Sequence, residues 1–454
     1  MNFFVLTTLR KSSPIPVEFA FNDDATNGNG CEELCIASSS IHQYLGDIKR
    51  TIETCNSDDW DAMKKITNPY EYIHTAVPGH KYAVSRMKPL SRSFYKMVEI
   101  IKHCKLLPPA SYGGGVGGGV GGGGGSHYGR SRAPEAPSAW CSGPIQTFHL
   151  AEGPGGFIEA LCYLRANNSD VYNGMTLLDE RSHSCPGWKK SRSFLERNPT
   201  VRIEFGADGT GNLLSLANYD ACCEKYQQSI DFITADGGFD FSSDFNNQEI
   251  LAMNLIAAEV FYAISMQKVG GTFVLKIFDM FTRVTIDLLQ MLCMAYDDVI
   301  IFKPNTSRIA NSEKYVVCKR FNIKCVEERM DMIGKIRTFF TRVGFNPSHA
   351  QDRPPPSVTG VLKPGTHNTH MLSRIEEINA ILGQQQIENI ISTVSLVQFK
   401  TNDRLENYKK LHVQKCVAWC DKYEVPCNKN LISTNTFMSS FGQQQSVQSS
   451  ACLL

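Results

Sequence analysis

Residues 145–157, which read IQTFHLAEGPGGF, constrain the fold more than any other stretch of this chain. Alternating apolar and β-branched residues predict a strand that ends at Glu152, and a glycine-rich turn and a helix-like apolar segment follow it. Glycines let a backbone bend tightly and approach a ligand that any Cβ would exclude. A strand, a glycine turn and a helix in this order are typical of the first unit of a nucleotide-binding α/β sheet.

The same alternation of strand and helix continues to residue 321. Apolar, β-branched runs predict six further strands within the segments 171–179, 201–208, 229–236, 271–279, 298–304 and 307–321. Longer apolar runs at 248–267 and 281–296 predict helices between them. Strands that alternate with crossover helices form a mostly parallel sheet with helices on both faces. We therefore expect an α/β, Rossmann-like fold with a seven-stranded sheet.

Acidic residues end four of the predicted strands. Glu152, Asp179, Asp208 and Asp236 should meet at one edge of the sheet, because parallel strands end at the same side and ligands bind there. The glycine turn has no lysine and the chain has no GxxxxGK[ST] sequence, which argues against ATP or GTP. Carboxylates suit a neutral or cationic nucleoside, whose hydroxyls, exocyclic amine and ammonium group need acceptors.

The charge of the chain is almost balanced. Lysine and arginine number 46 and aspartate and glutamate 45, which leaves a net charge of +1. Any RNA-binding surface must therefore be a local basic patch. One candidate patch lies in the turn-rich segment after residue 179, where Lys189, Lys190 and Arg192 follow the aromatic Trp188.

The 16 cysteines indicate reduced thiols rather than disulfides or a metal site. They are mostly scattered at core-like positions, and the apolar stretch at the start of the chain is too short for a secretion signal. The spacings of Cys31/Cys35 and of Cys416/Cys420/Cys427 match structural zinc sites poorly, so we expect no metal. No uncharged apolar run approaches the roughly 20 residues of a membrane span, so we expect no membrane partner.

Five segments together resemble one enzyme family. They read SRSFYKM, HLAEGPGGFIEAL, FITADGGFD, GGTFVLKIFD and FKPNTSRIANSEKYVVCKRF, and they cover about residues 88–108 and 141–321. In this order they resemble the FtsJ-type, S-adenosylmethionine-dependent RNA ribose 2′-O-methyltransferases. Within that family the chain looks most like the mRNA cap-1 enzymes of eukaryotes and large DNA viruses.

The resemblance implies a catalytic set and a cofactor site. The family's Lys-Asp-Lys-Glu set falls on Lys96, Asp236, Lys276 and Glu313. Lys276 would accept the proton of the ribose hydroxyl, Lys96 and Glu313 would orient and tune it, and Asp236 would bridge Lys276 and the methyl-sulfonium region. S-adenosyl-L-methionine would bind the turn and the ends of two later strands, at Glu152, Gly153, Pro154, Gly155, Gly156, Phe157, Asp179 and Asp208, the last accepting from the adenine amine.

A lysine can act as a base near neutral pH only if its pKa falls. Burial and a second nearby cation both favour the neutral amine, so we expect a lowered pKa at Lys276. For contacts with RNA phosphates the candidates are Lys189, Lys190, Arg192, Lys303 and Arg308. Lys303 and Arg308 are the preferred pair because they precede Glu313 closely in the sequence.

The chain divides into four predicted regions around the resemblance. We expect an N-terminal extension at 1–85 and an FtsJ-type methyltransferase domain at 86–325, with a disordered glycine-rich insertion at 109–139. A mainly helical C-terminal extension is expected at 326–435, with helices at 371–394 and 405–422, and a disordered tail at 436–454.

The resemblance implies methyl transfer to the ribose 2′-OH of the first transcribed nucleotide of capped mRNA. Two alternatives stay open: an rRNA or tRNA ribose methyltransferase, and a catalytically silent subunit of a capping or transcription complex. The expected partners are the capped 5′ end of mRNA and other capping or transcription proteins. The expected location is the cytoplasm or nucleus, or a viral factory or virion if the source is a large DNA virus.

Overall fold

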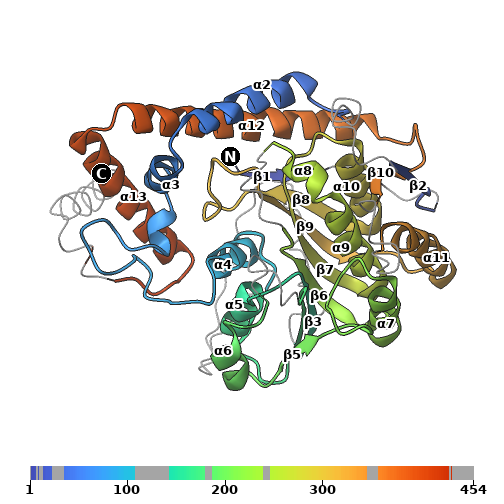
Figure 1. Ribbon diagram of the computed structural model, residues 1–454. Helices are drawn as coiled ribbons and strands as arrows, with labels where there is room; N and C mark the ends of the chain where they lie inside the picture. The colour runs from blue at the N-terminus through green and yellow to red at the C-terminus, as the bar shows by residue number, and fades with distance from the viewer. Residues whose placement is uncertain are drawn as a thin grey trace, which may run out of the picture.

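A central sheet organises the molecule (Figure 1). The computed structural model describes residues 2–6, 9, 14–22, 35–107, 143–178, 187–238, 246–344, 356–428 and 431. Within these residues the sheet has eight strands in the order β1-β8-β9-β7-β6-β3-β4-β5. The strands are β1 Phe3–Val5, β3 Gln146–Leu150, β4 Val171–Met175, β5 Val201–Glu204, β6 Ile230–Ala235, β7 Gln267–Ile277, β8 Tyr296–Phe302 and β9 Lys314–Phe321.

The sheet is mostly parallel, as predicted. Strands β7, β6, β3, β4 and β5 run parallel to one another, while β9 is antiparallel to both β7 and β8. The predicted number of seven strands is wrong, because β1 adds an eighth. This three-residue strand is the edge strand and pairs antiparallel with β8, with Phe3 opposite Phe302. The start of the chain reads as strand-like, but nothing in the local sequence shows that it joins this sheet.

Both faces of the sheet are buried, which explains the unbroken apolar runs in the central strands. Successive residues of a strand point to opposite faces. In β7, Phe273 and Leu275 therefore enter one core cluster, while Val274 between them enters the other. Helices cover the two faces separately, with α4 and α5 on one side and α7, α9, α10 and α11 on the other (Figure 1).

The helices from α4 to α10 follow the predicted alternation of strands and helices, and α11 comes after the last strand of the large sheet. The helices α4, α5, α6 and α7 span Ser93–His103, Gly156–Arg165, Arg192–Arg197 and Leu216–Tyr226. The helices α8, α9, α10 and α11 span Gln248–Leu251, Met253–Met266, Arg283–Ala295 and Val326–Val343. No helix in the described ranges is both long and apolar enough to cross a membrane.

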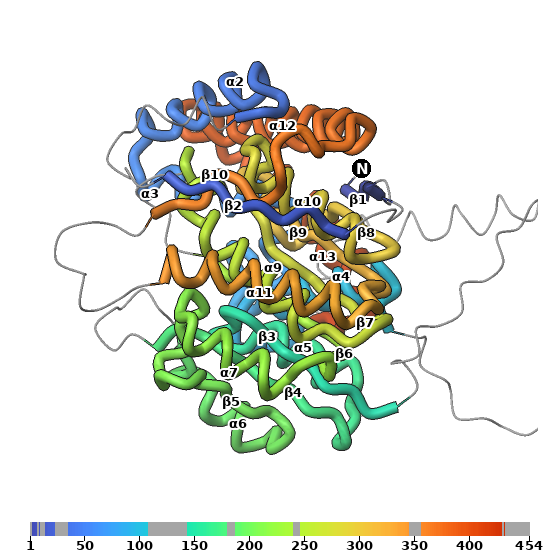
Figure 2. The backbone as a smooth tube through the Cα atoms, turned by 90° about the vertical axis from the view of Figure 1, so that its right-hand side faces the viewer, coloured from blue at the N-terminus to red at the C-terminus, as the bar shows by residue number. Residues whose placement is uncertain are grey.

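The N-terminal and C-terminal regions pack against each other as well as on the catalytic region. Figure 2 shows α12 (Thr369–Gln398) alongside α2 (Ser39–Arg50), and β2 (Val17–Asn22) beside β10 (Ser357–Leu362). The two strands form a small antiparallel sheet. The remaining elements of these regions are η2 Thr51–Thr54, α3 Ser57–Ile66, η3 Glu71–Ile73 and α13 Asn402–Lys422. The C-terminal region is thus mainly helical, as predicted, with one strand.

Three predictions fall outside the described residues. They concern the glycine-rich insertion at 109–139, the tail at 436–454 and Asp179. The division into domains stays a prediction.

Candidate active site

Asp236 and Lys276 lie side by side at the carboxyl edge of the sheet. In the parallel pair β6–β7, Ala235 lies opposite Leu275, so the next residues along both strands are neighbours at the carboxyl edge. The ammonium of Lys276 lies 3.3 Å from Oδ1 of Asp236 and donates a 2.8 Å hydrogen bond to the Asp236 carbonyl. The register of β6 and β7 therefore brings this pair together.

Lys96 and Glu313 form a second ion pair from distant parts of the chain. Lys96 lies in the first turn of α4, and Glu313 directly precedes β9. The ammonium of Lys96 lies 2.7 Å from Oε1 and 2.8 Å from Oε2 of Glu313. Lys96 is only 5% exposed, although an isolated lysine on a helix usually faces solvent.

Tyr315 joins the two ion pairs. Its hydroxyl donates a 3.0 Å hydrogen bond to Oδ1 of Asp236, and the ammonium of Lys96 lies 6.0 Å from the centre of its ring. The four predicted catalytic side chains thus form one cluster around a buried tyrosine. Sequence analysis missed Tyr315, but period-2 alternation from Glu313 would have placed both residues on one face.

The two lysines of the cluster differ electrostatically. Burial lowers the pKa of Lys96, and the cations of Arg92 and Lys276 add to this effect against the attraction of Glu313. Burial also acts on Lys276, but the carboxylates of Asp236 and Glu313 outweigh it, so the pKa of Lys276 is raised. The expected lowering of the Lys276 pKa is therefore wrong.

Glu313 stays ionised beside these lysines. Burial would raise the pKa of its carboxyl, but Lys96 and Lys276 hold that pKa well below its usual range. The hydroxyl of Ser307 donates a further 2.8 Å hydrogen bond to Oε1 of Glu313. The cluster therefore has a fixed, charged carboxylate at one side and Asp236 at the other.

A third carboxyl group lies behind the Asp236 turn. Glu259 of α9 is fully buried, and its Oε1 accepts a 3.1 Å hydrogen bond from the Gly237 amide. Its Oε2 is buried with no hydrogen-bond partner among the described residues. Burial, helped by Asp236, raises the pKa of Glu259 to about 8. The signal in the sequence was a single charged residue in an otherwise apolar helix.

The glycine turn after β3 is built around Glu152. Oε1 of this carboxylate accepts hydrogen bonds from the amides of Phe157 (2.8 Å) and Ile158 (3.1 Å) at the start of α5. Burial raises the pKa of Glu152 to about 8. Its Oε2 is buried and, within the described ranges, has no partner. Gly155 adopts a φ of 107°, which favours glycine.

Gly156 lets α4 approach the turn. A Cβ at this position would overlap the hydroxyls of Ser91 and Ser93, just before Lys96. We expect Gly156→Ala to lower the free energy of unfolding by about 1–3 kcal/mol, as overpacking of a tight contact does. Thermal denaturation would measure this. Gly46→Ala is the matched control, because a Cβ there meets no atom within 4 Å; an equal loss in both variants would contradict the expectation.

Asp208 does not end a strand as predicted. Strand β5 ends at Glu204, and Asp208 lies in the loop beyond it. Oδ1 of Asp208 accepts hydrogen bonds from the amide of Thr210 (2.9 Å), its hydroxyl (2.6 Å) and the Asn218 amide (2.8 Å). The loop packs beside the segment that follows β4, where the Leu178 amide donates a 2.8 Å hydrogen bond to the Thr210 carbonyl. Asp208 therefore orders this loop, and its contact with adenine stays a prediction.

The basic patch around Trp188 is partly open. Lys189, Lys190 and Arg192 are exposed, and Arg192 pairs with Glu196 at 3.0 Å. Trp188 itself packs against Gly155 and Gly174. The indole therefore covers the glycine turn rather than standing free for base stacking.

Lys303 and Arg308 do not present unpaired cations to solvent. The ammonium of Lys303 is buried and donates to the carbonyls of Asn311 and Glu313. Arg308 forms two hydrogen bonds to the buried carboxylate of Glu71, at 2.6 and 3.0 Å. The preference for these two residues as phosphate contacts is therefore wrong, because both are occupied by structural partners.

Within the described ranges, no group of three or more His, Cys, Asp or Glu side chains gathers as a metal ion would require.

Curated proteins from several animals are similar to part of this chain. The cap-specific mRNA (nucleoside-2′-O-)-methyltransferase 2 of Danio rerio is 33% identical over 212 residues, which cover 41% of this chain and 26% of that protein. The cap-specific mRNA (nucleoside-2′-O-)-methyltransferase 1 of Mus musculus is 34% identical over 179 residues, covering 38% and 21%. The chain thus spans about a quarter or less of these two relatives.

Among solved structures, a putative ribosomal RNA methyltransferase of Plasmodium falciparum matches with a TM-score of 0.28 and 19% identity. The match covers 39% of this chain and 86% of that one. The family model of the FtsJ-like methyltransferases matches residues 89–321, just over half of the chain and the whole of the charged cluster. The chain therefore belongs to the FtsJ-like methyltransferase family.

Proposed function

We propose that this chain transfers a methyl group from S-adenosylmethionine to the ribose 2′-OH of the first transcribed nucleotide of capped mRNA. The observation that carries the proposal is the buried cluster of Lys96, Asp236, Lys276 and Glu313 at the carboxyl edge of the sheet. The names of the relatives in fish and mouse support the same reaction, since both are cap-specific 2′-O-methyltransferases.

The residues around the glycine turn fit this cofactor. Oε2 of Glu152 is a buried acceptor without a partner in the described part of the chain, next to a turn that a Cβ would obstruct. An ammonium group or a ribose hydroxyl would satisfy that oxygen. Glu152, Gly153, Pro154, Gly155, Gly156 and Phe157 would hold the cofactor, with Asp208, and Asp179 beyond the described residues, as further candidates.

When bound, the cofactor supplies a methyl group on a sulfonium that is already a strong electrophile. The chain has to align the ribose hydroxyl and accept its proton. Lys276 is the proposed proton acceptor, because it stands at the strand end beside Asp236. Lys96 and Glu313 hold the other side of the cluster and position the hydroxyl.

The raised pKa of Lys276 fits a base that is activated by its ligand. In the ligand-free chain, carboxylates outweigh burial at Lys276. A positive sulfonium nearby disfavours a second cation, and exclusion of water strengthens that repulsion. Occupancy of the site therefore shifts the Lys276 amine toward the neutral form that accepts a proton.

RNA phosphates are proposed to contact Lys189, Lys190 and Arg192. These side chains are exposed cations on the segment that carries Trp188 over the glycine turn. Contacts of this kind position a strand without reading its sequence.

The test is the transfer of labelled methyl from S-adenosylmethionine to short RNAs, capped and uncapped, followed by digestion to nucleosides. We expect label in the ribose of the first nucleotide, and only with a capped substrate. Label in uncapped or structured RNA would instead indicate an rRNA or tRNA enzyme. Cofactor binding without any transfer would indicate a silent subunit.

Glu259 should affect methyl transfer through its hydrogen bond to the turn after β6. Glu259→Gln keeps an acceptor for the Gly237 amide and should retain near wild-type transfer at pH 7. Glu259→Ala leaves that amide buried and unpaired, which costs about 1–3 kcal/mol, so we expect transfer to fall about tenfold or more. The measurement is the rate of methyl transfer in both variants.

The pH profile separates charge from structure at Glu259. Wild-type Glu259 ionises only as the pH passes about 8, and its carboxylate then favours the protonated form of Lys276. The activity of Glu259→Gln relative to wild type should therefore rise above pH 8. A Gln variant that loses as much activity as Ala at pH 7 would contradict the role of the hydrogen bond.

A further inference from the structure

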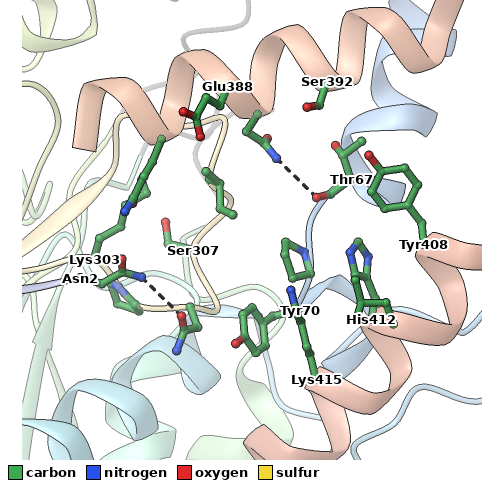
Figure 3. A pocket seen from close by; sticks show the side chains of 17 residues that line it. Asn2, Thr67, Tyr70, Lys303, Ser307, Glu388, Ser392, Tyr408, His412 and Lys415 are labelled. Carbon is green, nitrogen blue, oxygen red and sulfur yellow. Dashed lines mark hydrogen bonds between the residues drawn. The ribbon is translucent and has the colours of Figure 1, made fainter. Parts of the chain in front are cut away.

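A cavity lies beside the charged cluster, between regions far apart in the sequence. Its volume is about 440 Å³, which is in the range of small-molecule sites. Figure 3 shows Glu388 and Ser392 projecting into it from α12, and Tyr408, His412 and Lys415 from α13. Its opposite wall comes from the start of the chain and from the segment 303–309 after β8.

The cavity lies at the same edge of the sheet as the candidate active site. Strand β8 runs parallel to β7, because both are antiparallel to β9. Residue 303 therefore follows β8 at the edge where β7 ends, one residue after Lys276. Two residues of the cavity wall also touch the cluster. Ser307 donates to the Glu313 carboxylate at 2.8 Å, and Lys303 donates to the Glu313 carbonyl at 2.9 Å. An RNA strand bound along this edge would reach both the charged cluster and the cavity.

The lining has aromatic faces. Tyr70, Tyr408 and His412 all line the cavity, and the rings of Tyr408 and His412 lie 5.4 Å apart. Bases stack on such side chains whatever their sequence. His412 is 2% exposed, and its Nδ1 is buried with no hydrogen-bond partner in the part of the chain described. A ligand with polar edges would satisfy that atom.

The lining also has polar groups that no other contact uses fully. Lys415 and Glu388 form no ion pair within the described residues, although both line the cavity. Amide side chains that can pair with base edges lie around them, including Gln385 and Asn389. A cation for phosphate, aromatic faces and amide edges together match a nucleotide better than an apolar ligand.

We propose that this cavity binds one nucleotide of the RNA substrate, at a position other than the methyl acceptor. The base stacks on Tyr408, the amide side chains pair with its edge, and Lys415 takes its phosphate. This inference rests on the proposed function, since it takes RNA as the substrate. It goes beyond that function by adding a second contact for the strand, built by the N-terminal and C-terminal regions.

The test is binding of a fluorescently labelled capped RNA of about ten nucleotides to the full chain, measured by anisotropy. We expect Tyr408→Ala and Lys415→Glu each to weaken binding about 5- to 100-fold, the range of one lost stacked base or phosphate contact. Tyr408→Phe keeps the ring and should bind within about twofold of wild type. Lys410→Glu is the matched control, because it makes the same charge change at an exposed site on α13 outside the cavity.

Free guanosine and adenosine monophosphates, titrated separately, distinguish the source of the nucleotide. Weak binding that Tyr408→Ala removes would show that the base is recognised without a strand, which supports a nucleotide site. Thermal denaturation checks that each variant is folded. If Tyr408→Ala does not fold, Lys415→Glu still tests the proposal, because Lys415 is exposed. RNA and mononucleotide affinities unchanged in both variants would overturn the proposal.

The binding test of the cavity and the methyl-transfer test of the proposed function can fail independently. If wild type methylates capped RNA but the cavity variants bind it unchanged, only the inference fails. If no RNA is methylated but nucleotide binding depends on Tyr408, the proposed reaction fails and the cavity remains a nucleotide site.

Discussion

Replacement of Lys276 by alanine is expected to reduce methyl transfer at least about a thousandfold while the cofactor still binds. A positioned general base contributes about 10²–10⁴-fold, and Lys276 also holds Asp236 through its ion pair and its hydrogen bond to the main chain. The glycine turn around Glu152 is held by hydrogen bonds from the start of α5, and Lys276 takes no part in them. The measurements are single-turnover methyl transfer and the dissociation constant for S-adenosylmethionine.

Lys268→Ala is the matched control for that loss. Lys268 lies on the same strand, but its side chain is 55% exposed and pairs with Asp231 at 2.9 Å, away from the carboxyl edge. Exposed pairs contribute little to stability, so this variant should transfer methyl at the wild-type rate. Turnover close to wild type in Lys276→Ala would remove Lys276 from the mechanism.

The sheet could be predicted from the sequence because its strands are buried on both faces. Such strands read as continuous apolar runs, and the glycine turn and crossover helices fix their direction. Asp236 and Lys276 were paired by the resemblance to the family's motifs, and the register of β6 and β7 explains why they meet. The edge strand at Phe3–Val5 was not counted in the sheet, because a strand-like sequence at the start of the chain does not show which distant strand it pairs with.

Pairing across the chain limited the prediction of the cluster and its surroundings. Lys303 and Arg308 looked like open cations because the local sequence shows only their closeness to Glu313. Their actual partners include Glu71, which is 237 residues from Arg308. The sign of the Lys276 pKa shift failed for the same reason, since it depends on the summed field of carboxylates from three elements.

Loss of the ion pair between Glu71 and Arg308 is expected to have the largest effect on stability. The Glu71 side chain is fully buried, and Arg308 and Asn68 saturate its two oxygens with hydrogen bonds of 2.6–3.0 Å. Removal of one partner from a buried ion pair typically costs about 3–5 kcal/mol, because the other charge stays buried and unpaired. We expect Glu71→Ala to lose that much free energy of unfolding in denaturant titrations. Glu196→Ala, which breaks the exposed pair with Arg192, should lose less than about 1 kcal/mol.

The pH dependence of this loss identifies its cause. Arg308 outweighs burial and lowers the pKa of Glu71 to about 2, whereas the unfolded chain protonates it near its ordinary value of about 4.3. Between these values the unfolded state binds more protons, so the contribution of Glu71 is fully present above about pH 4.5 and is lost as the pH falls toward 2. The stability difference between wild type and Glu71→Gln should therefore be constant from pH 7 to pH 5 and shrink below pH 4.5. A difference that does not change with pH down to 3 would show that packing, rather than the charge of Glu71, supports the segment that carries Ser307 to Glu313.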